Sequence, residues 1–211
     1  MFIGLTSEQF EEKIQSALSL DLPYSDPVQR RLMDPSGSQT RPAAVCILFA
    51  SSSQKPSGPI LLLTKRSETL EIHKGQMAFP GGLCESQDQG NPVRTALRET
   101  EEEMGIPSEC IKVLGELPRL VTGTGFLIQP IVGVSKKSLE KMVLNPNPDE
   151  IDEVIWVSLQ TLLRPETYRN EFFLRELVQY PIDVFQVGQY RIWGATGTIL
   201  KNLLDRLTTF R

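Results

Sequence analysis

Histidine and cysteine are scarce in this chain of 211 residues: there is one histidine, His73, and there are three cysteines, Cys46, Cys84 and Cys110, with no CxxC pair. This scarcity excludes the usual histidine-based zinc sites. An odd number of scattered cysteines does not form a disulfide framework either, and free thiols are typical of a reducing compartment. We therefore expect a cytoplasmic protein.

Long apolar segments and a basic excess are also missing. The longest apolar run, residues 43–50, is far shorter than the roughly 20 residues of a membrane-spanning helix, and residues 1–5 do not begin a secretory signal. The formal net charge is -4, which argues against nucleic acid or an anionic membrane as a partner. A small anionic ligand is compatible with this charge, because a few local cations or a metal ion are enough to bind it.

Three widespread catalytic signatures are absent from the sequence. There is no GxxxxGK[ST] phosphate loop, no GxSxG nucleophile turn and no GxGxxG dinucleotide turn. The enzyme classes that depend on these motifs are therefore excluded.

The residues that are present alternate irregularly between helix and strand patterns. Segments rich in Pro, Gly, Ser, Asp and Asn, at 21–42, 51–58 and 75–91, are expected to be loops. This order favours an α+β fold over a doubly wound sheet. The expected helices follow Thr6, cover 92–104, start at Ser158 and cover 195–207; the expected strands cover 43–50, 59–64, 111–116, 126–134 and 154–157.

The segment 92–104 is expected to be an amphipathic helix. Asn91 is a typical N-cap, Pro92 suits the first helical position, and Gly105 is a stop signal. At about 100° per residue, two faces separate. The packing face comprises Val93, Ala96, Leu97, Thr100 and Met104, and the acidic face comprises Glu99, Glu102 and Glu103.

The acidic face needs a compensating charge. Neighbouring carboxylates on a helix repel one another, and Arg98, which can reach Glu102 at i+4, does not neutralise three acids. A carboxylate cluster without histidine or cysteine selects Mg²⁺ or Mn²⁺ over zinc. A solvated acidic surface is the alternative for such a run.

The acidic helix and the turn before it together resemble the Nudix box, G-x5-E-x7-R-E-U-x-E-E-x-G-U, in which U is aliphatic. The matching residues are the turn 79–82 (FPGG), Asp88, and 98–106 (RETEEEMGI). The chain departs from the box in three ways: two extra residues lie between Gly82 and Arg98, Asp88 replaces a glutamate, and Thr100 replaces an aliphatic residue. The role of Asp88 stays open.

The resemblance implies a Nudix fold, a mixed β-sheet sandwiched between helices. Residues 41–211 would form the Nudix hydrolase domain with its C-terminal helix, and residues 1–40 an N-terminal helix with an irregular extension. Nudix hydrolases use a divalent metal to cleave a nucleoside diphosphate linked to another group. The resemblance further implies a homodimer, to which the helix after Thr6 and the helix after Ala195 contribute.

The resemblance also assigns roles to the acidic helix. Glu99 and Glu103 would bind the metal and Glu102 would add a further carboxylate, while Arg98 would orient the glutamates. Glu102 or Glu103 would take the proton from the attacking water, which makes these two residues and Arg98 the expected catalytic residues. Glu150, on a later loop, is an alternative base. We expect the glutamates to be surface carboxylates outside the core.

An extended pattern resembles the coenzyme A pyrophosphatase subfamily, whose members split CoA into 3′,5′-ADP and 4′-phosphopantetheine. Its signature, L-L-T-x-R-[SA]-x3-R-x3-G-x3-F-P-G-G, matches 62–82 except at Glu71, where the signature has an arginine. A glutamate there reverses the local charge, although CoA carries a 3′-phosphate that suits basic side chains. The expected substrate-binding residues are Arg66, Lys74, Gln76, Gly81 and Gly82.

Two other hypotheses share the fold. Glu71 and the longer loop at 84–91 favour a different nucleotide substrate, such as an ADP-sugar, a dinucleoside polyphosphate or an oxidised nucleotide. A catalytically silent, nucleotide-sensing Nudix module would be expected to have a broken acidic trio. In this chain the trio is complete.

Overall fold

The protein is described by a computed structural model that covers residues 2, 4–22, 24, 40–52, 58–70, 72–175 and 178–209. The α-helices are α1 (Ser7–Leu18), α3 (Pro92–Met104), α4 (Leu159–Leu162) and α5 (Gly194–Thr209). The 3-10 helices are η1 (Ser86–Asp88), η2 (Ser108–Cys110), η3 (Leu139–Lys141) and η4 (Pro165–Thr167). The strands are β1 (Arg41–Ser52), β2 (Gly58–Arg66), β3 (Met77–Ala78), β4 (Gly81–Leu83), β5 (Ile111–Glu116), β6 (Leu120–Val121), β7 (Phe126–Ser135), β8 (Ile151–Ser158), β9 (Tyr168–Arg175), β10 (Val178–Val187) and β11 (Tyr190–Ile192).

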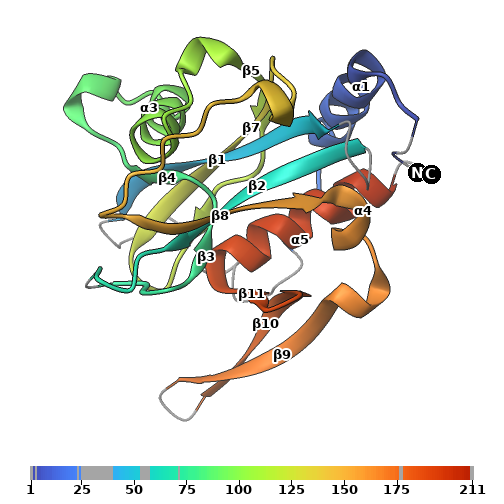
Figure 1. Cartoon of the computed structure of the whole chain (residues 1–211). Helices are drawn as coiled ribbons and strands as arrows, with labels where there is room; N and C mark the ends of the chain where they lie inside the picture. Colours follow the sequence, from blue (N-terminus) through green and yellow to red (C-terminus); the bar gives the residue numbers. More distant parts are fainter. Residues whose placement is uncertain are drawn as a thin grey trace.

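In the described part of the chain, eight strands form a mixed sheet in the order β3–β2–β1–β7–β5, with β4 beside β1, β6 beside β7 and β8 beside β2. β1 and β7 are parallel, whereas β1 and β2 are antiparallel. Helix α3 covers one face of this sheet, and α1, α4 and α5 lie on the other (Figure 1). The expected α+β fold, with a mixed sheet between helices, is confirmed.

β1 is the centre of both cores because its side chains alternate between the two faces. Ala44, Cys46 and Leu48 point to the α3 side, whereas Ile47 and Phe49 point to the side of α1 and α5. A strand covered on both faces needs a continuous apolar run, which explains the composition of residues 43–50.

The N-terminal helix packs against the last helix. Thr6 and Gln9 form the expected capping box, and Phe10 and Ile14 are buried in the same core as α5. Arg206 of α5 is 2% exposed and donates to the carbonyls of residues 18, 20 and 22. These bonds satisfy carbonyls at and beyond the end of α1 that have no partner within the helix.

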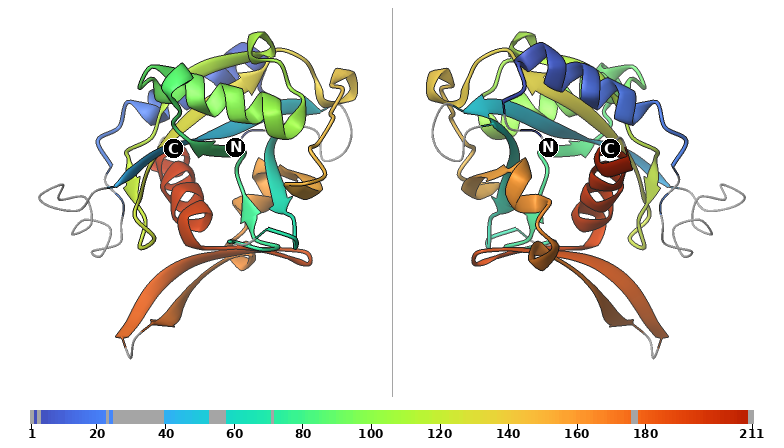
Figure 2. Two further views of the ribbon diagram at one scale, coloured as in Figure 1. Left: turned by 90° about the vertical axis from the view of Figure 1, so that its left-hand side faces the viewer. Right: turned by 90° about the vertical axis from the view of Figure 1, so that its right-hand side faces the viewer.

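Strands β9, β10 and β11 were not expected from the sequence. They form a separate three-stranded sheet in the order β11–β10–β9, which extends away from the rest of the molecule (Figures 1 and 2). Asn170 and Pro181 interrupt the apolar pattern of this segment, and such residues are depleted in strands.

Other expectations agree more closely with the structure. The expected strands are present and most are longer than predicted, and Ser158 is the N-cap of α4. The expectation of a loop at 75–91 is wrong in part, because the short strands β3 and β4 lie within it. Most of the expected loop 21–42 lies outside the described residues. The three cysteines have free thiols, as expected. Each described helix is too short or too polar to cross a membrane.

Candidate active site

Helix α3 has the ends that the sequence predicts. The side chain of Asn91 accepts from the Val93 amide at 2.9 Å. Gly105 adopts φ 67°, and its amide donates to the Glu101 carbonyl at 2.8 Å. From the expected packing face, Ala96, Thr100 and Met104 are buried, while Val93 and Leu97 are partly buried against the same core. The helix is therefore held with its acidic face turned toward β4.

The expectation that the three glutamates are surface carboxylates is wrong for two of them. Glu103 is 2% exposed and the side chain of Glu99 is 15% exposed, whereas that of Glu102 is 55% exposed. Burial disfavours a charged carboxylate, so it raises the pKa of Glu103 to about 8 and also raises the pKa of Glu99. The surrounding chain therefore shields Glu99 and Glu103 from solvent, whereas Glu102 stays exposed.

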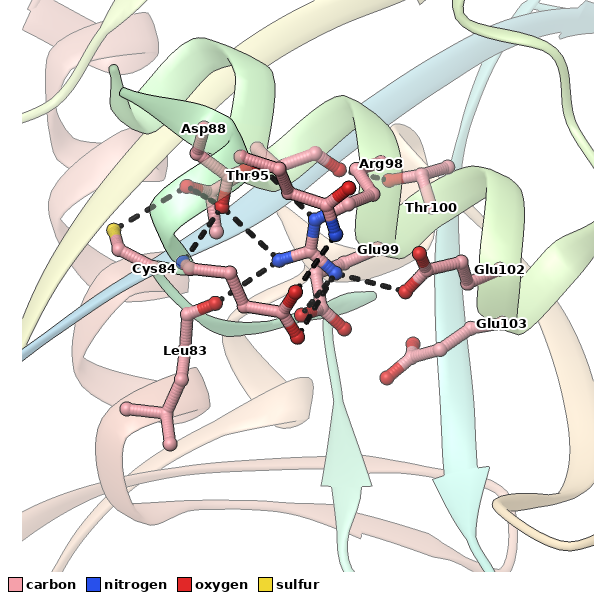
Figure 3. Close-up of polar contacts among 12 residues, drawn as sticks. Leu83, Cys84, Asp88, Thr95, Arg98, Glu99, Thr100, Glu102 and Glu103 are labelled. Carbon is pink, nitrogen blue, oxygen red and sulfur yellow. Dashed lines mark hydrogen bonds and ion pairs between the residues drawn. The ribbon is translucent and has the colours of Figure 1, made fainter. Parts of the chain in front are cut away.

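Arg98 connects the carboxylates (Figure 3). Its Nη1 lies 2.9 Å from Glu99 and 2.8 Å from Glu102, which confirms the expected contact at i+4. Its Nε and Nη2 each lie 3.1 Å from an oxygen of Asp88, and Nη2 also donates to the Leu83 carbonyl at 3.0 Å. The Arg98 guanidinium, which Asp88 and the Leu83 carbonyl hold in place, therefore orients two acids of the helix.

Asp88, whose role the sequence left open, is the residue that holds Arg98 in place. The residue is 2% exposed and accepts from the Thr95 hydroxyl at 2.8 Å and from the Glu85 amide at 2.9 Å. The hydrogen bonds from Arg98 are the main reason that its pKa is lowered to about 2. The longer loop folds into η1 and a left-handed turn at Gln89, with φ 55°. This turn brings Asp88 under the helix.

The two glycines of the FPGG turn let β4 approach the acids. A Cβ atom at Gly82 would lie 2.5 Å from the carboxylate carbon of Glu99. A Cβ atom at Gly81 would lie 2.3 Å from the carbonyl oxygen of Ala44, and the Gly81 backbone slightly opposes the rise that burial causes in the pKa of Glu103. Side chains at these positions would displace either the acid or the strand, so the turn needs glycine.

Arg66 faces the acidic helix from the end of β2, where the pairing with β8 shifts register. Its Nη1 lies 3.9 Å from Glu103. Its Nε is buried and has no hydrogen-bond partner among the described residues. A buried donor without a partner is costly, so an anionic ligand that reached this nitrogen would remove that cost.

The other expected substrate-binding residues lie on the loop between β2 and β3. The Gln76 carbonyl accepts from the Arg66 amide at 3.0 Å, and the Gln76 side chain contacts His73 at 2.9 Å. Lys74 is exposed. Lys65, a neighbour of Arg66, instead lies 3.0 Å from Glu153, which also accepts from the Tyr190 hydroxyl. Glu71 lies outside the described residues.

A fourth carboxylate comes from a distant part of the chain. The amides of Asn145 and Asn147 donate to the carbonyls of Met104 and Glu103 at the end of α3. The Asn147 side chain in turn holds Glu150 at 3.3 Å. The negative charge of Glu150 contributes to the raised pKa values of Glu99 and Glu103. The loop that caps the helix therefore adds Glu150 to the acidic group.

The chemistry of these donors fits a hard divalent ion, because all are carboxylate oxygens and two of the acids are buried. No three such side chains in the described chain converge as a ready metal site, since Arg98 lies between Glu99 and Glu102. Binding one ion through several of these acids therefore requires their side chains to rotate closer together.

Comparison with known proteins identifies the family of this chain. The family model described as the NUDIX domain matches residues 39–179. An uncharacterized Nudix hydrolase NudL of Photorhabdus laumondii is 38% identical over 181 residues, covering 86% of this chain and 90% of the relative. A protein of the same description from Yersinia pestis is 30% identical, covering 97% and 98%.

A solved structure supports the fold. The MutT/nudix family protein from Enterococcus faecalis superposes with a TM-score of 0.50 at 16% identity, covering 97% of this chain and 76% of that one. At this identity the likeness concerns the fold alone. The family model and the two relatives, which span nearly the whole chain, decide the membership. This chain belongs to the Nudix hydrolase family.

Proposed function

We propose that this protein uses a divalent metal ion to hydrolyse a diphosphate bond in a nucleoside diphosphate derivative, and that this derivative is coenzyme A. The reaction adds one water molecule across the P–O–P bridge of CoA and yields 3′,5′-ADP and 4′-phosphopantetheine. The observation that carries the proposal is the position of Arg66, which has a buried, unpartnered Nε and lies 3.9 Å from Glu103 through Nη1. This position supports a contact between Arg66 and a phosphate, beside the acids that would hold a metal.

Glu99, Glu102 and Glu103 would hold the metal. A bound Mg²⁺ or Mn²⁺ neutralises the diphosphate and lowers the pKa of a coordinated water. Arg98 positions Glu99 and Glu102 from its pair with Asp88. The proton of the attacking water passes to Glu102 or Glu103, and Glu150 is the alternative acceptor because it belongs to the same acidic group.

The substrate would be bound by the hairpin between β2 and β3. Arg66 is suited to a phosphate because its guanidinium donates in a fixed planar arrangement. Lys74 adds an exposed positive charge on the same loop, and Gln76 supports the backbone of Arg66. Gly81 and Gly82 keep the approach to Glu99 and Glu103 free of side chains. The subfamily signature across 62–82 supports CoA as the substrate.

The second candidate keeps the chemistry and changes the substrate. Glu71 places a negative charge where the CoA signature has an arginine, which favours a ligand without the 3′-phosphate, such as an ADP-sugar, a dinucleoside polyphosphate or an oxidised nucleotide. A silent sensing module is disfavoured, because the acidic trio Glu99, Glu102 and Glu103 is complete.

We also propose a homodimer in the cytoplasm. The family resemblance supports the homodimer, and the free thiols of the three cysteines support a reducing compartment.

The test is product analysis by mass spectrometry. Purified protein is incubated with CoA, ADP-ribose, NADH, diadenosine polyphosphates and dNTPs, each with Mg²⁺ or Mn²⁺. Preferential cleavage of CoA to 3′,5′-ADP supports the proposal. Preference for another compound retains the diphosphatase chemistry and rejects CoA. No cleavage of any compound, in a sample whose melting temperature responds to Mg²⁺, supports the sensing module.

A further inference from the structure

Large hydrophobic side chains are exposed side by side on β9. Phe172, Phe173 and Leu174 are 67%, 42% and 61% exposed. The remaining exposed large hydrophobic residues of the described chain, Ile72, Leu83 and Val143, stand singly in different segments. Single exposed apolar residues are ordinary on protein surfaces, whereas a contiguous group marks a contact surface.

β9 is also an edge strand. In the described structure it pairs with β10 only, and both views show the β9–β10 hairpin extending away from the central sheet (Figures 1 and 2). The outer side of such a strand presents unpaired amides and carbonyls. The apolar segment 172–174 at such an edge is a template for pairing with another strand.

Both faces of this edge carry apolar groups. Phe172 and Leu174 share one face, because alternate residues of a strand point the same way. Phe173 lies on the other face, where its ring is 5.7 Å from that of Trp193. A pairing strand would therefore be covered on both sides.

The helices named by the family resemblance offer less surface for a dimer. The apolar residues of α1, Phe10 and Ile14, and those of α5, Ile199 and Leu203, are already buried within one chain. The apolar faces of α1 and α5 are thus used to build the core. The exposed apolar area lies on β9 instead.

We propose that β9 pairs antiparallel with β9 of a second copy of this chain, about a twofold axis at Phe173. In this register Phe173 faces Phe173 of the partner subunit, and Phe172 faces Leu174 of the partner subunit on the same side of the sheet. The whole apolar group is then paired with itself, which is the self-complementarity that a twofold interface requires. The two hairpins would form one continuous sheet.

The area suggests a reversible dimer. Phe172 and Phe173 together would bury on the order of 200 Å² per protomer, because a fully buried phenylalanine covers about 150–250 Å². A standard interface buries about 800 Å² per partner. Backbone pairing of residues 171–175, the part of β9 that overlaps in this register, and the adjacent side chains must supply the rest. This association does not depend on the reaction proposed above.

Sedimentation velocity of the full chain across a wide concentration range tests the proposal. We expect a monomer–dimer equilibrium for the wild type, a monomer for the double variant Phe172→Lys, Leu174→Lys, and wild-type behaviour for the control Val143→Lys. A wild type that is monomeric up to its solubility limit would overturn the proposal. A double variant that still dimerises would also overturn it, because the interface would then lie elsewhere.

A cross-link tests the register even if the lysine variant fails to fold. Facing residues in antiparallel strands have Cβ atoms about 4.5–5.5 Å apart, near the distance that a disulfide spans. Phe173→Cys should therefore yield a covalent dimer on mild oxidation, whereas the wild type and Val143→Cys should not. Phe173→Cys that stays monomeric on a non-reducing gel, or cross-links no more than Val143→Cys, contradicts the pairing.

Discussion

Arg98 and Asp88 form a two-bond ion pair in which Nε and Nη2 donate to the two carboxylate oxygens, each at 3.1 Å. Asp88 lies ten residues before Arg98 and is buried. The pair fixes Nε and Nη2 of the guanidinium and leaves Nη1 directed at Glu99 and Glu102. The geometry of the acidic group therefore depends on a buried residue outside helix α3.

Asp88→Asn should destabilise the protein and slow the reaction. The change removes the buried anion of the pair and leaves Arg98 with Glu99 and Glu102 alone, and losing hydrogen bonds to a charged group costs about 1.5–3 kcal/mol. We expect a lower urea midpoint at pH 7 and a lower kcat, because Arg98 no longer positions Glu99 and Glu102. The control Glu166→Gln, at an exposed residue of η4, should change neither quantity. Equal stability of Asp88→Asn and wild type would show that the pair is unimportant.

The same variant has a predicted pH dependence. Because the folded-state pKa of Asp88 is about 2, below the ordinary 3.8, its stabilisation is complete above the ordinary value. It is lost as the pH falls toward the folded-state value. The difference in unfolding free energy between wild type and Asp88→Asn should therefore narrow between about pH 4 and pH 2. A difference that is constant through this range would contradict the assignment.

Glu102→Gln and Glu103→Gln should each lower turnover strongly. Loss of a metal ligand or proton acceptor costs about 10²–10⁴-fold in rate, whereas Glu101→Gln, at an exposed acid of the same helix, should stay near wild type. Glu103→Gln should not lower the melting temperature much, because an amide is cheaper to bury than a carboxylate. The rates are measured with the preferred substrate at saturating Mg²⁺.

A binding measurement separates metal loss from other defects. Mg²⁺ should raise the melting temperature of the wild type and of Glu101→Gln, and should raise that of Glu103→Gln less. If both catalytic variants kept near-full activity, the metal-site assignment would be wrong.

Arg66→Met should raise KM more than it lowers kcat. The variant removes a charge-assisted contact to phosphate, worth about 1.5–3 kcal/mol, or about 10–100-fold in affinity. Lys65→Met is the matched control, because Lys65 is paired with Glu153 and should leave KM nearly unchanged. Steady-state kinetics would count against a phosphate contact if the two variants behaved alike.

Glu71→Arg should raise the turnover of CoA relative to other nucleotides. The change restores the positive charge of the subfamily signature, which suits the 3′-phosphate of CoA. The ratio of kcat/KM for CoA to that for ADP-ribose measures the effect. An unchanged or lower ratio would count against this account of Glu71.

Much of the fold was predictable because the helix-end signals and the apolar runs in the sequence agree with the elements that form and the residues that are buried. The Thr6 capping box, the Asn91 cap and the Gly105 stop all mark helix ends through short-range hydrogen bonds. The apolar run 43–50 predicts a strand covered on both faces. The sheet of β9 to β11 was missed because it has little core of its own, so the periodic burial that reveals a strand is weak there.

Part of the candidate site was also predictable from local sequence signals. Arg98 and the glutamates lie on one helix, so their spacing alone places Arg98 within reach of Glu102. The burial of Glu103 could not be predicted, because it depends on β4 and on a loop more than forty residues later. Asp88 and Glu150 reach the acidic group only through turns whose course no periodicity reveals.

The sequence by itself determined the identity and order of the chemical groups: a helix with three acids and one arginine, a glycine turn before it, and a composition able to bury a core. The tertiary structure alone decided which of those acids are buried, which anion holds Arg98, and which nitrogen of Arg66 is left without a hydrogen-bond partner among the described residues. The physical reason is that these two kinds of interaction act over different separations along the sequence. Helix periodicity and capping act over three or four residues, whereas burial and ion pairing depend on segments that meet only when the sheet has formed.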